Sequence, residues 1–256
     1  MIIQRKKRMT PITRWSILFV TVAFFVVVLT LIYEMSKTKS FDAANQSVQI
    51  PVLAIGGSVA HGWKDTTGPG YLARAFLELS SHSNTSYHYI DRTIVGANGV
   101  QLATLYKNHY LEWLHAFAPK VVIISWGLLN DALPKTPIST FDFHIRQEIA
   151  EALSVHAVVL MVTPPVTKAS YTQFKVQEPR YVLHEIQVAK SFNSPNVVVC
   201  DVYDQMRSYI VAHKQSYKMY MGDGWHPNSA GHILAGHLLY KDIIAHYGNK
   251  AISYVG

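Results

Sequence analysis

Val121-Val122-Ile123-Ile124 and Val158-Val159-Leu160-Met161-Val162 are the two stretches that decide the fold class of this chain. Both are apolar throughout, without the alternation of a strand that has one face in water. Continuous apolar runs of this length are typical of parallel strands that are covered by helices on both faces. We therefore predict that each run forms a buried strand in the middle of a parallel β-sheet.

Apolar runs and segments of helical period alternate along the chain on both sides of these two strands. The five predicted strands are residues 49–55, 87–95, 121–126, 157–162 and 196–202. The predicted helices are residues 71–81, 100–117, 141–153, 181–192 and 229–247. This alternation indicates right-handed βαβ crossovers. We predict a three-layer α/β/α sandwich with a five-stranded parallel sheet, a flavodoxin-like architecture.

Residues 15–33 contain no charged side chain and would span about 28 Å as a helix, close to the thickness of a bilayer core. Residues 1–14 hold five basic residues and no acidic one, whereas few charges follow the segment closely. The asymmetry predicts a transmembrane anchor with a cytoplasmic N-terminus and an extracytoplasmic body. A cleaved signal peptide is the alternative, but the segment is long for one and no clear cleavage site follows it.

The remaining organisation is simple. Residues 34–47 are polar and weakly patterned, which predicts a tether, and residues 48–256 are long enough for one domain. The net charge of +7 gives no reason to expect nucleic-acid binding, because five of the positive charges precede the apolar segment. A single cysteine, Cys200, excludes an internal disulfide.

Asp223-Gly224-Trp225-His226 is the stretch that carries the clearest chemistry. An aspartate three residues before a histidine, in a turn bounded by glycine and proline, can accept the Nδ1 proton and leave Nε2 free as a base. Ser58, directly after the first predicted strand, is the candidate nucleophile. Each motif alone also fits a plain turn, since glycine and serine are common turn residues.

The position of these residues in the predicted sheet favours catalysis. Ser58, Gly96 and Asn130 each follow a different predicted strand, and Asp223 and His226 lie in the connection after the fifth. Ligands of parallel α/β sheets bind beyond the carboxyl ends of the strands, so all five residues are expected at one edge. We predict a catalytic triad of Ser58, Asp223 and His226, with Ser58 at the N-terminus of a helix.

Over residues 50–245 the pattern resembles the SGNH hydrolases, also called GDSL-type esterases or lipases. Gly56-Gly57-Ser58-Val59 is similar to their Gly-Asp-Ser-Leu motif, residues 93–96 and 127–131 to their second and third blocks, and residues 223–228 to their fifth. The resemblance implies that Ser58 is the nucleophile. It also implies an oxyanion hole made by the Ser58 and Gly96 amides and the Asn130 side chain.

Two departures from the family pattern stand out. Gly57 takes the place of the usual aspartate. In the third block, two residues instead of one separate Gly127 from Asn130. Either Leu128 takes the place of the glycine, or the strand exit holds an extra residue.

The resemblance implies a serine esterase or deacylase that hydrolyses acyl esters outside the cytoplasmic membrane through an acyl-serine intermediate. No cofactor and no metal are expected. The expected partners are an acyl-ester small molecule, a lipid or an acylated cell-envelope polymer, and the membrane through the N-terminal helix. An acyltransferase that uses the same triad and a catalytically silent binding module remain alternatives.

Residues 166–178 follow the fourth predicted strand and lack a strong period. A segment of this length at the ligand-binding edge is where a lid or specificity loop is expected. We therefore predict that Tyr171, Phe174 and Lys175 contact the substrate.

Overall fold

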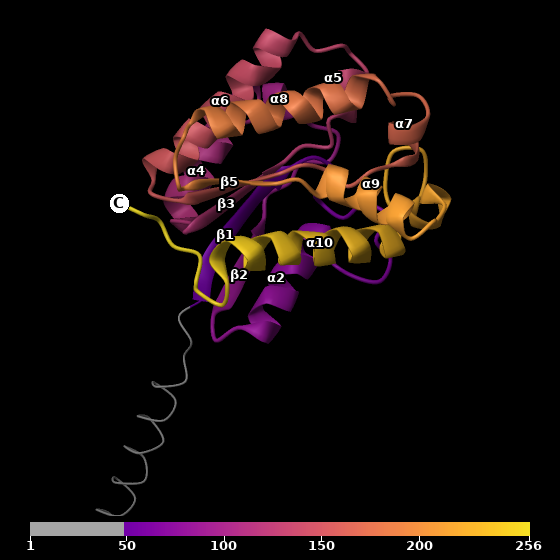
Figure 1. Ribbon diagram of the computed structural model, residues 1–256. Coiled ribbons are helices and arrows are strands. Elements are labelled where there is room, and N and C mark those ends of the chain that lie inside the picture. Colours follow the sequence, from indigo (N-terminus) through magenta and orange to yellow (C-terminus); the bar gives the residue numbers. More distant parts are fainter. Residues whose placement is uncertain (1–48) are drawn as a thin grey trace, which may run out of the picture. The chain divides into compact units, whose positions relative to one another are not determined.

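The computed structural model describes residues 49–256, which form an α/β sandwich around one parallel sheet (Figure 1). Its five strands are arranged in the order β2-β1-β3-β4-β5, the order of flavodoxin-like sheets. Their bounds are β1 (Gln49–Gly56), β2 (Ser86–Asp91), β3 (Val121–Ser125), β4 (Val158–Val162) and β5 (Val197–Cys200). The predicted five-stranded parallel sheet is therefore confirmed.

Helices lie on both faces of this sheet, with α2 (Tyr71–His82) and α10 (Ser229–Tyr247) on one face, and α6 (Ile138–Ser154) and α8 (Gln177–Ser191) on the other (Figure 1). The remaining helices are α3 (Gly99–Thr104), α4 (Lys107–Phe117), α5 (Leu129–Ala132), α7 (Lys168–Tyr171), α9 (Val202–Ala212) and the 3₁₀-helix η1 (Tyr217–Tyr220).

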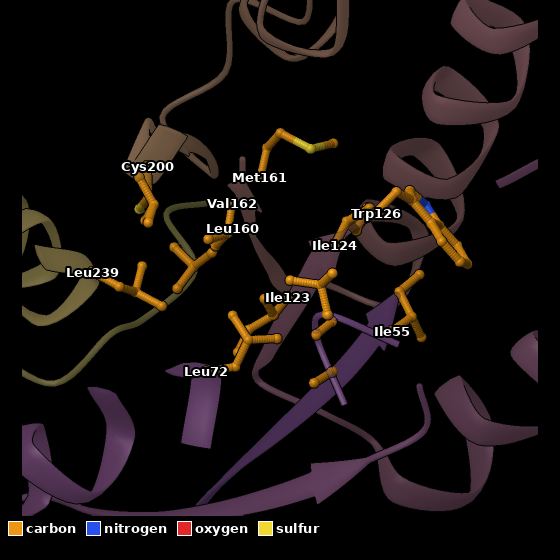
Figure 2. Packing of buried hydrophobic residues seen from close by; sticks show 14 of the residues in the cluster. Ile55, Leu72, Ile123, Ile124, Trp126, Leu160, Met161, Val162, Cys200 and Leu239 are labelled. Atoms are coloured by element: carbon orange, nitrogen blue, oxygen red, sulfur yellow. The ribbon is translucent and has the colours of Figure 1, made fainter. Parts of the chain in front are cut away.

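The core explains why the two central strands are apolar at every position. All residues of β3 and β4 are buried, because helices cover both faces of the sheet and leave no side chain of either strand in water. Figure 2 shows Ile123 and Leu160 packed together with Leu72 of α2 and Leu239 of α10, whereas Ile124 lies beside Trp126. Each such buried side chain stabilises the fold by about 1.5–3 kcal/mol.

Three predicted elements have different bounds in the structure. The helix expected over residues 100–117 is two helices, α3 and α4, which meet at Leu105 and Tyr106. The second strand ends at Asp91, because the Asp91 carboxylate accepts hydrogen bonds from the Thr93 amide and hydroxyl and turns the chain. The fifth strand ends at Cys200, because Asp201 caps α9, a helix that was not predicted.

The predicted cytoplasmic segment, anchor and tether, at residues 1–14, 15–33 and 34–47, lie outside the described residues. Within residues 49–256, no helix is long and apolar enough to cross a membrane.

Candidate active site

Ser58 lies two residues beyond β1, at the carboxyl edge of the sheet. The chain there forms tight turns, in which the His61 amide donates to the Gly57 carbonyl at 3.0 Å and the Trp63 amide to the Ser58 carbonyl at 3.0 Å. The prediction that Ser58 begins a helix is wrong, because the next helix starts only at Tyr71. A helix dipole therefore does not act on Ser58.

Asp223 shapes the loop that carries His226. One carboxylate oxygen accepts the backbone amides of Trp225 at 2.7 Å and His226 at 2.8 Å, which closes a tight turn. Burial raises the pKa of Asp223, but the hydrogen bonds from the Trp225 amide and from His226 outweigh it, so the pKa is lower than usual. The carboxylate is therefore ionised at neutral pH.

The structure brings Ser58, His226 and Asp223 together. Ser58 Oγ lies 2.9 Å from His226 Nε2, and His226 Nδ1 lies 3.0 Å from both carboxylate oxygens of Asp223. With the Nδ1 proton directed at the carboxylate, Nε2 accepts the hydrogen bond from the serine hydroxyl. The arrangement has the geometry of a nucleophile, a base and an orienting acid.

Gly96 and Asn130, the predicted oxyanion donors, lie in loops that are hydrogen-bonded to each other. Asn130 Nδ2 donates to the Ala97 carbonyl at 2.9 Å, and Asn98 Nδ2 donates to an Asp131 carboxylate oxygen at 2.9 Å. Gly96 has a φ of 83°, a left-handed conformation that favours glycine. Within residues 49–256, neither the Ser58 nor the Gly96 amide has an acceptor, so both are available to a ligand.

Leu128 is the residue at which the third block departs from the family pattern. Its φ of 58° and ψ of −19° place it in the left-handed region, although its side chain is fully buried. A residue two positions before Asn130 thus has the backbone conformation that glycine adopts most easily. This geometry favours the interpretation in which Leu128 takes the place of the family's glycine.

Gly57, the other departure, lies against the loop of Gly96. A Cβ atom at this position would lie 3.1 Å from the Ala97 carbonyl oxygen and 3.9 Å from Asn130 Nδ2. Glycine therefore allows the loop after β2 to approach the nucleophile turn closely. A larger side chain would push on the carbonyl that orients Asn130.

Residues 166–178 pack against the loop that carries His226. Phe174 is buried and packs edge-on against Trp225, with 5.8 Å between the ring centroids, and the Ala169 amide donates to the Gly224 carbonyl at 3.0 Å. Tyr171 is stacked on Tyr217 at 4.3 Å. The prediction that Phe174 contacts the substrate is wrong, because its side chain is buried against Trp225.

Lys175, the third residue predicted to contact substrate, is exposed to solvent. A groove of about 540 Å³ adjoins Gly96 and Asn130 instead, and no residue of 166–178 lines it. Its walls come from the start of α3, from the segment between α5 and α6, and from the first turn of α6: Asn98, Val100, Gln101, Leu133, Pro134, Thr136, Pro137 and Thr140.

Sequence reasoning missed the structural role of the loop between Ser58 and α2. The side chain of Asp65 is fully buried, and its Oδ2 atom accepts a hydrogen bond from Arg74 Nε at 2.8 Å. Trp63 lies beside His226, and its carbonyl accepts from the buried His232. Only a charged residue pair nine positions apart marks this loop in the sequence, and that spacing alone indicates no contact.

Several solved structures are similar to this chain in fold. A lipase/acylhydrolase from Enterococcus faecalis has a TM-score of 0.58 at 20% identity, covering 79% of this chain and 100% of its own. An acetyl xylan esterase has a TM-score of 0.62 at 17% identity, with 76% and 100% covered. The esterase EstA from Pseudoalteromonas sp. has a TM-score of 0.56 at 14% identity, with 76% and 97% covered.

At these identities the likeness shows the fold alone. Comparison with curated proteins finds no sequence match. The sequence pattern of the GDSL-like Lipase/Acylhydrolase family, however, matches residues 54–234, which is more than half of the chain and includes Ser58, Gly96, Asn130 and His226. This chain therefore belongs to the GDSL-like lipase/acylhydrolase family and is an ester hydrolase.

Proposed function

We propose that this chain is a serine esterase or deacylase that acts outside the cytoplasmic membrane through an acyl-Ser58 intermediate. The observation that carries the proposal is the 2.9 Å contact between Ser58 Oγ and His226 Nε2, with Asp223 on the other side of the imidazole. The extracytoplasmic location is supported by the apolar, positively flanked segment at residues 15–33.

The first step is attack on the ester carbonyl. Ser58 Oγ forms a bond to the carbonyl carbon while His226 Nε2 takes the hydroxyl proton. Asp223 holds the Nδ1 proton and stabilises the imidazolium that results. Because its carboxylate also accepts two backbone amides of its own turn, it is fixed in place before the substrate binds.

The tetrahedral intermediate carries its negative charge on the former carbonyl oxygen. The amides of Ser58 and Gly96 and the Asn130 carboxamide are the donors for it. Asn130 uses one of its two amide hydrogens for the Ala97 carbonyl, and the second remains for the oxyanion. Donors that are oriented beforehand stabilise developing charge without reorganisation.

Collapse of the intermediate breaks the bond to the alcohol oxygen, which leaves with the proton held by His226 Nε2. Water then attacks the acyl-Ser58 ester while His226 takes one of its protons. A second collapse releases the carboxylic acid and returns the proton to Ser58 Oγ. The cycle consumes one ester and one water, and it requires no cofactor.

The groove beside Gly96 and Asn130 suits the acyl group, since the carbonyl carbon of a bound ester lies next to the oxyanion donors. Its volume of about 540 Å³ has room for more than an acetyl group. We propose acyl-ester small molecules, lipids or acylated cell-envelope polymers as the substrate class.

The test is hydrolysis of 4-nitrophenyl acetate, butyrate and octanoate by the full chain in detergent, together with labelling by a fluorophosphonate. Ser58→Ala is expected to abolish both, whereas Ser154→Ala, which removes an exposed hydroxyl at the far end of α6, is expected to change neither. Unlabelled, inactive wild type would contradict the proposal. Labelling without hydrolysis would favour an acyltransferase that excludes water.

A further inference from the structure

Trp63 is an exposed aromatic residue beside the proposed catalytic base. Its side chain is 44% exposed, and its ring centroid lies 6.3 Å from that of His226. A single exposed apolar residue is ordinary on a protein surface. The position of Trp63 is not ordinary, because the Nε2 atom of the neighbouring imidazole faces the Ser58 hydroxyl.

The backbone of Trp63 is held at both ends. Its amide donates to the Ser58 carbonyl at 3.0 Å, and its carbonyl accepts from His232 Nε2 at 3.1 Å. His232 belongs to α10 and is fully buried. Trp63 is therefore tied to the nucleophile on one side and to the helix that follows His226 on the other.

The residues after Trp63 are fixed as firmly. The buried Asp65 carboxylate accepts two hydrogen bonds from Arg74 of α2, at 2.8 and 3.0 Å, and one from the Gly70 amide at 3.1 Å. The Thr66 amide donates to Ser229 of α10 at 2.9 Å. A loop with these contacts cannot fold over the site, so the indole is presented to a ligand in one position. Ordering such a residue on binding costs little.

The chemistry of the site decides which part of an ester meets this indole. The leaving alcohol oxygen must lie within hydrogen-bond reach of His226 Nε2, because it takes its proton from that atom. The carbonyl oxygen must face Gly96 and Asn130, whose groove is lined by neither Trp63 nor His226. Trp63 is next to the base, on the side of α10, and so it adjoins the alcohol and not the acyl group.

We propose that Trp63 binds the alcohol moiety of the substrate, and that the favoured esters are those of ring alcohols. This inference rests on the proposed function. A ring with a flat apolar face and a polar rim, as in an acylated sugar, can lie on the indole while its rim stays hydrated. Lys64, a polar and exposed neighbour on the same loop, suits such a rim.

The test holds the acyl group constant and varies the alcohol. Ethyl acetate, 4-nitrophenyl acetate and glucose pentaacetate are hydrolysed by the full chain, by Trp63→Ala and by Trp63→Phe. Trp63→Ala is expected to raise KM for the two ring esters about tenfold and to leave ethyl acetate within about twofold. Trp63→Phe is expected to restore most of the loss. Phe143→Ala, which removes another exposed aromatic from α6, serves as the matched control and is expected to change nothing.

Two outcomes would overturn the proposal. An equal loss in kcat on all three esters would mean that Trp63 only positions His226. A loss that follows acyl length, in 4-nitrophenyl acetate against octanoate, would place Trp63 on the acyl side. Failure of the proposed function is seen separately, as wild-type hydrolysis that is absent or that survives Ser58→Ala.

Discussion

Asn130 is tied to Ala97 by a hydrogen bond of 2.9 Å from its Nδ2 atom to the Ala97 carbonyl. The bond joins the turn after β3 to the loop after β2, and it orients the carboxamide before any substrate is present. The Asn98 carboxamide reinforces the link by donating to the Asn130 carbonyl at 3.2 Å. Two of the three proposed oxyanion donors, the Gly96 amide and the Asn130 carboxamide, thus lie in loops that are linked before substrate binds.

Removal of the Asn130 carboxamide is therefore expected to affect turnover more than binding. Asn130→Ala should lower kcat for 4-nitrophenyl acetate about 10²–10³-fold, because the donor acts on charge that is present only in the transition state. KM should change little. Steady-state kinetics measure both constants, and an unchanged kcat would mean that Asn130 does not face the oxyanion.

Asp223→Asn tests the role of the acid without removing the turn that it caps. The asparagine Oδ1 can still accept the Trp225 and His226 amides, so the loop is expected to keep its shape. Without the carboxylate, the imidazole loses the partner that fixes its tautomer, and kcat should fall about 10⁴-fold. Kinetics and a thermal melt together check this prediction. A variant with near-normal turnover would show that another group orients His226.

The Asp65–Arg74 pair is expected to matter for stability, since the Asp65 carboxylate is fully buried. Asp65→Asn leaves the partly exposed Arg74 guanidinium without its charged partner and should lower the free energy of unfolding by about 1–3 kcal/mol. Glu112→Gln, in the exposed pair with His109, is the matched control and should have almost no effect. Urea denaturation measures both.

The stabilisation from Asp65 should also depend on pH in a defined direction. Burial acts to raise its pKa, but the hydrogen bonds from Arg74, Thr67 and Gly70 lower it well below the ordinary value of 3.8. A depressed pKa in the folded state contributes stability above the unfolded pKa and loses it as the pH falls below that value. The difference between wild type and Asp65→Asn should therefore shrink in acid. A constant difference from pH 7 to pH 3 would contradict this reasoning.

Glu148 is expected to have the opposite pH dependence. It is buried on α6, where burial raises its pKa from 4.5 to about 8 despite a hydrogen bond from Trp126 Nε1 at 2.8 Å. The folded state then holds a proton that the unfolded state releases above pH 4.5, so stability falls as the pH rises from 4.5 to 8. Glu148→Gln keeps an acceptor for Trp126 and removes this titration. In urea denaturation, the free energy of unfolding of the variant minus that of wild type should increase from pH 5 to pH 8. The same difference at both pH values would contradict the prediction.

The sheet and the residues of the site could both be predicted from the sequence, because the apolar runs place the strands. Unbroken apolar runs such as Val121-Val122-Ile123-Ile124 have few explanations other than strands covered on both faces. Once the strands are placed, the rule that ligands bind at their carboxyl ends brings Ser58 and His226 to one edge, although 168 residues separate them. Topology supplied the long-range contact that local pattern could not.

The features that the sequence did not predict involve side chains that are buried where their residue type or segment is usually exposed. Glu148, Glu178 and Glu185 are buried carboxyl groups on amphipathic helices, where glutamate usually indicates the solvent face. The role of Phe174 was misjudged, because a weak period indicates a loop but does not say whether its aromatic ring points inward. The turn after Ser58 looked like a helix start because serine is a common cap.

β1 crosses the sheet from its amino edge to its carboxyl edge. Its eight residues extend about 26 Å, from Gln49 at the amino edge of the sheet to the turn of Ser58 at the carboxyl edge. Gln49 thus lies at the edge of the sheet remote from the triad. Attachment of the domain to a bead or a sensor surface directly at the amino end of β1 would accordingly leave the site open to large substrates in solution.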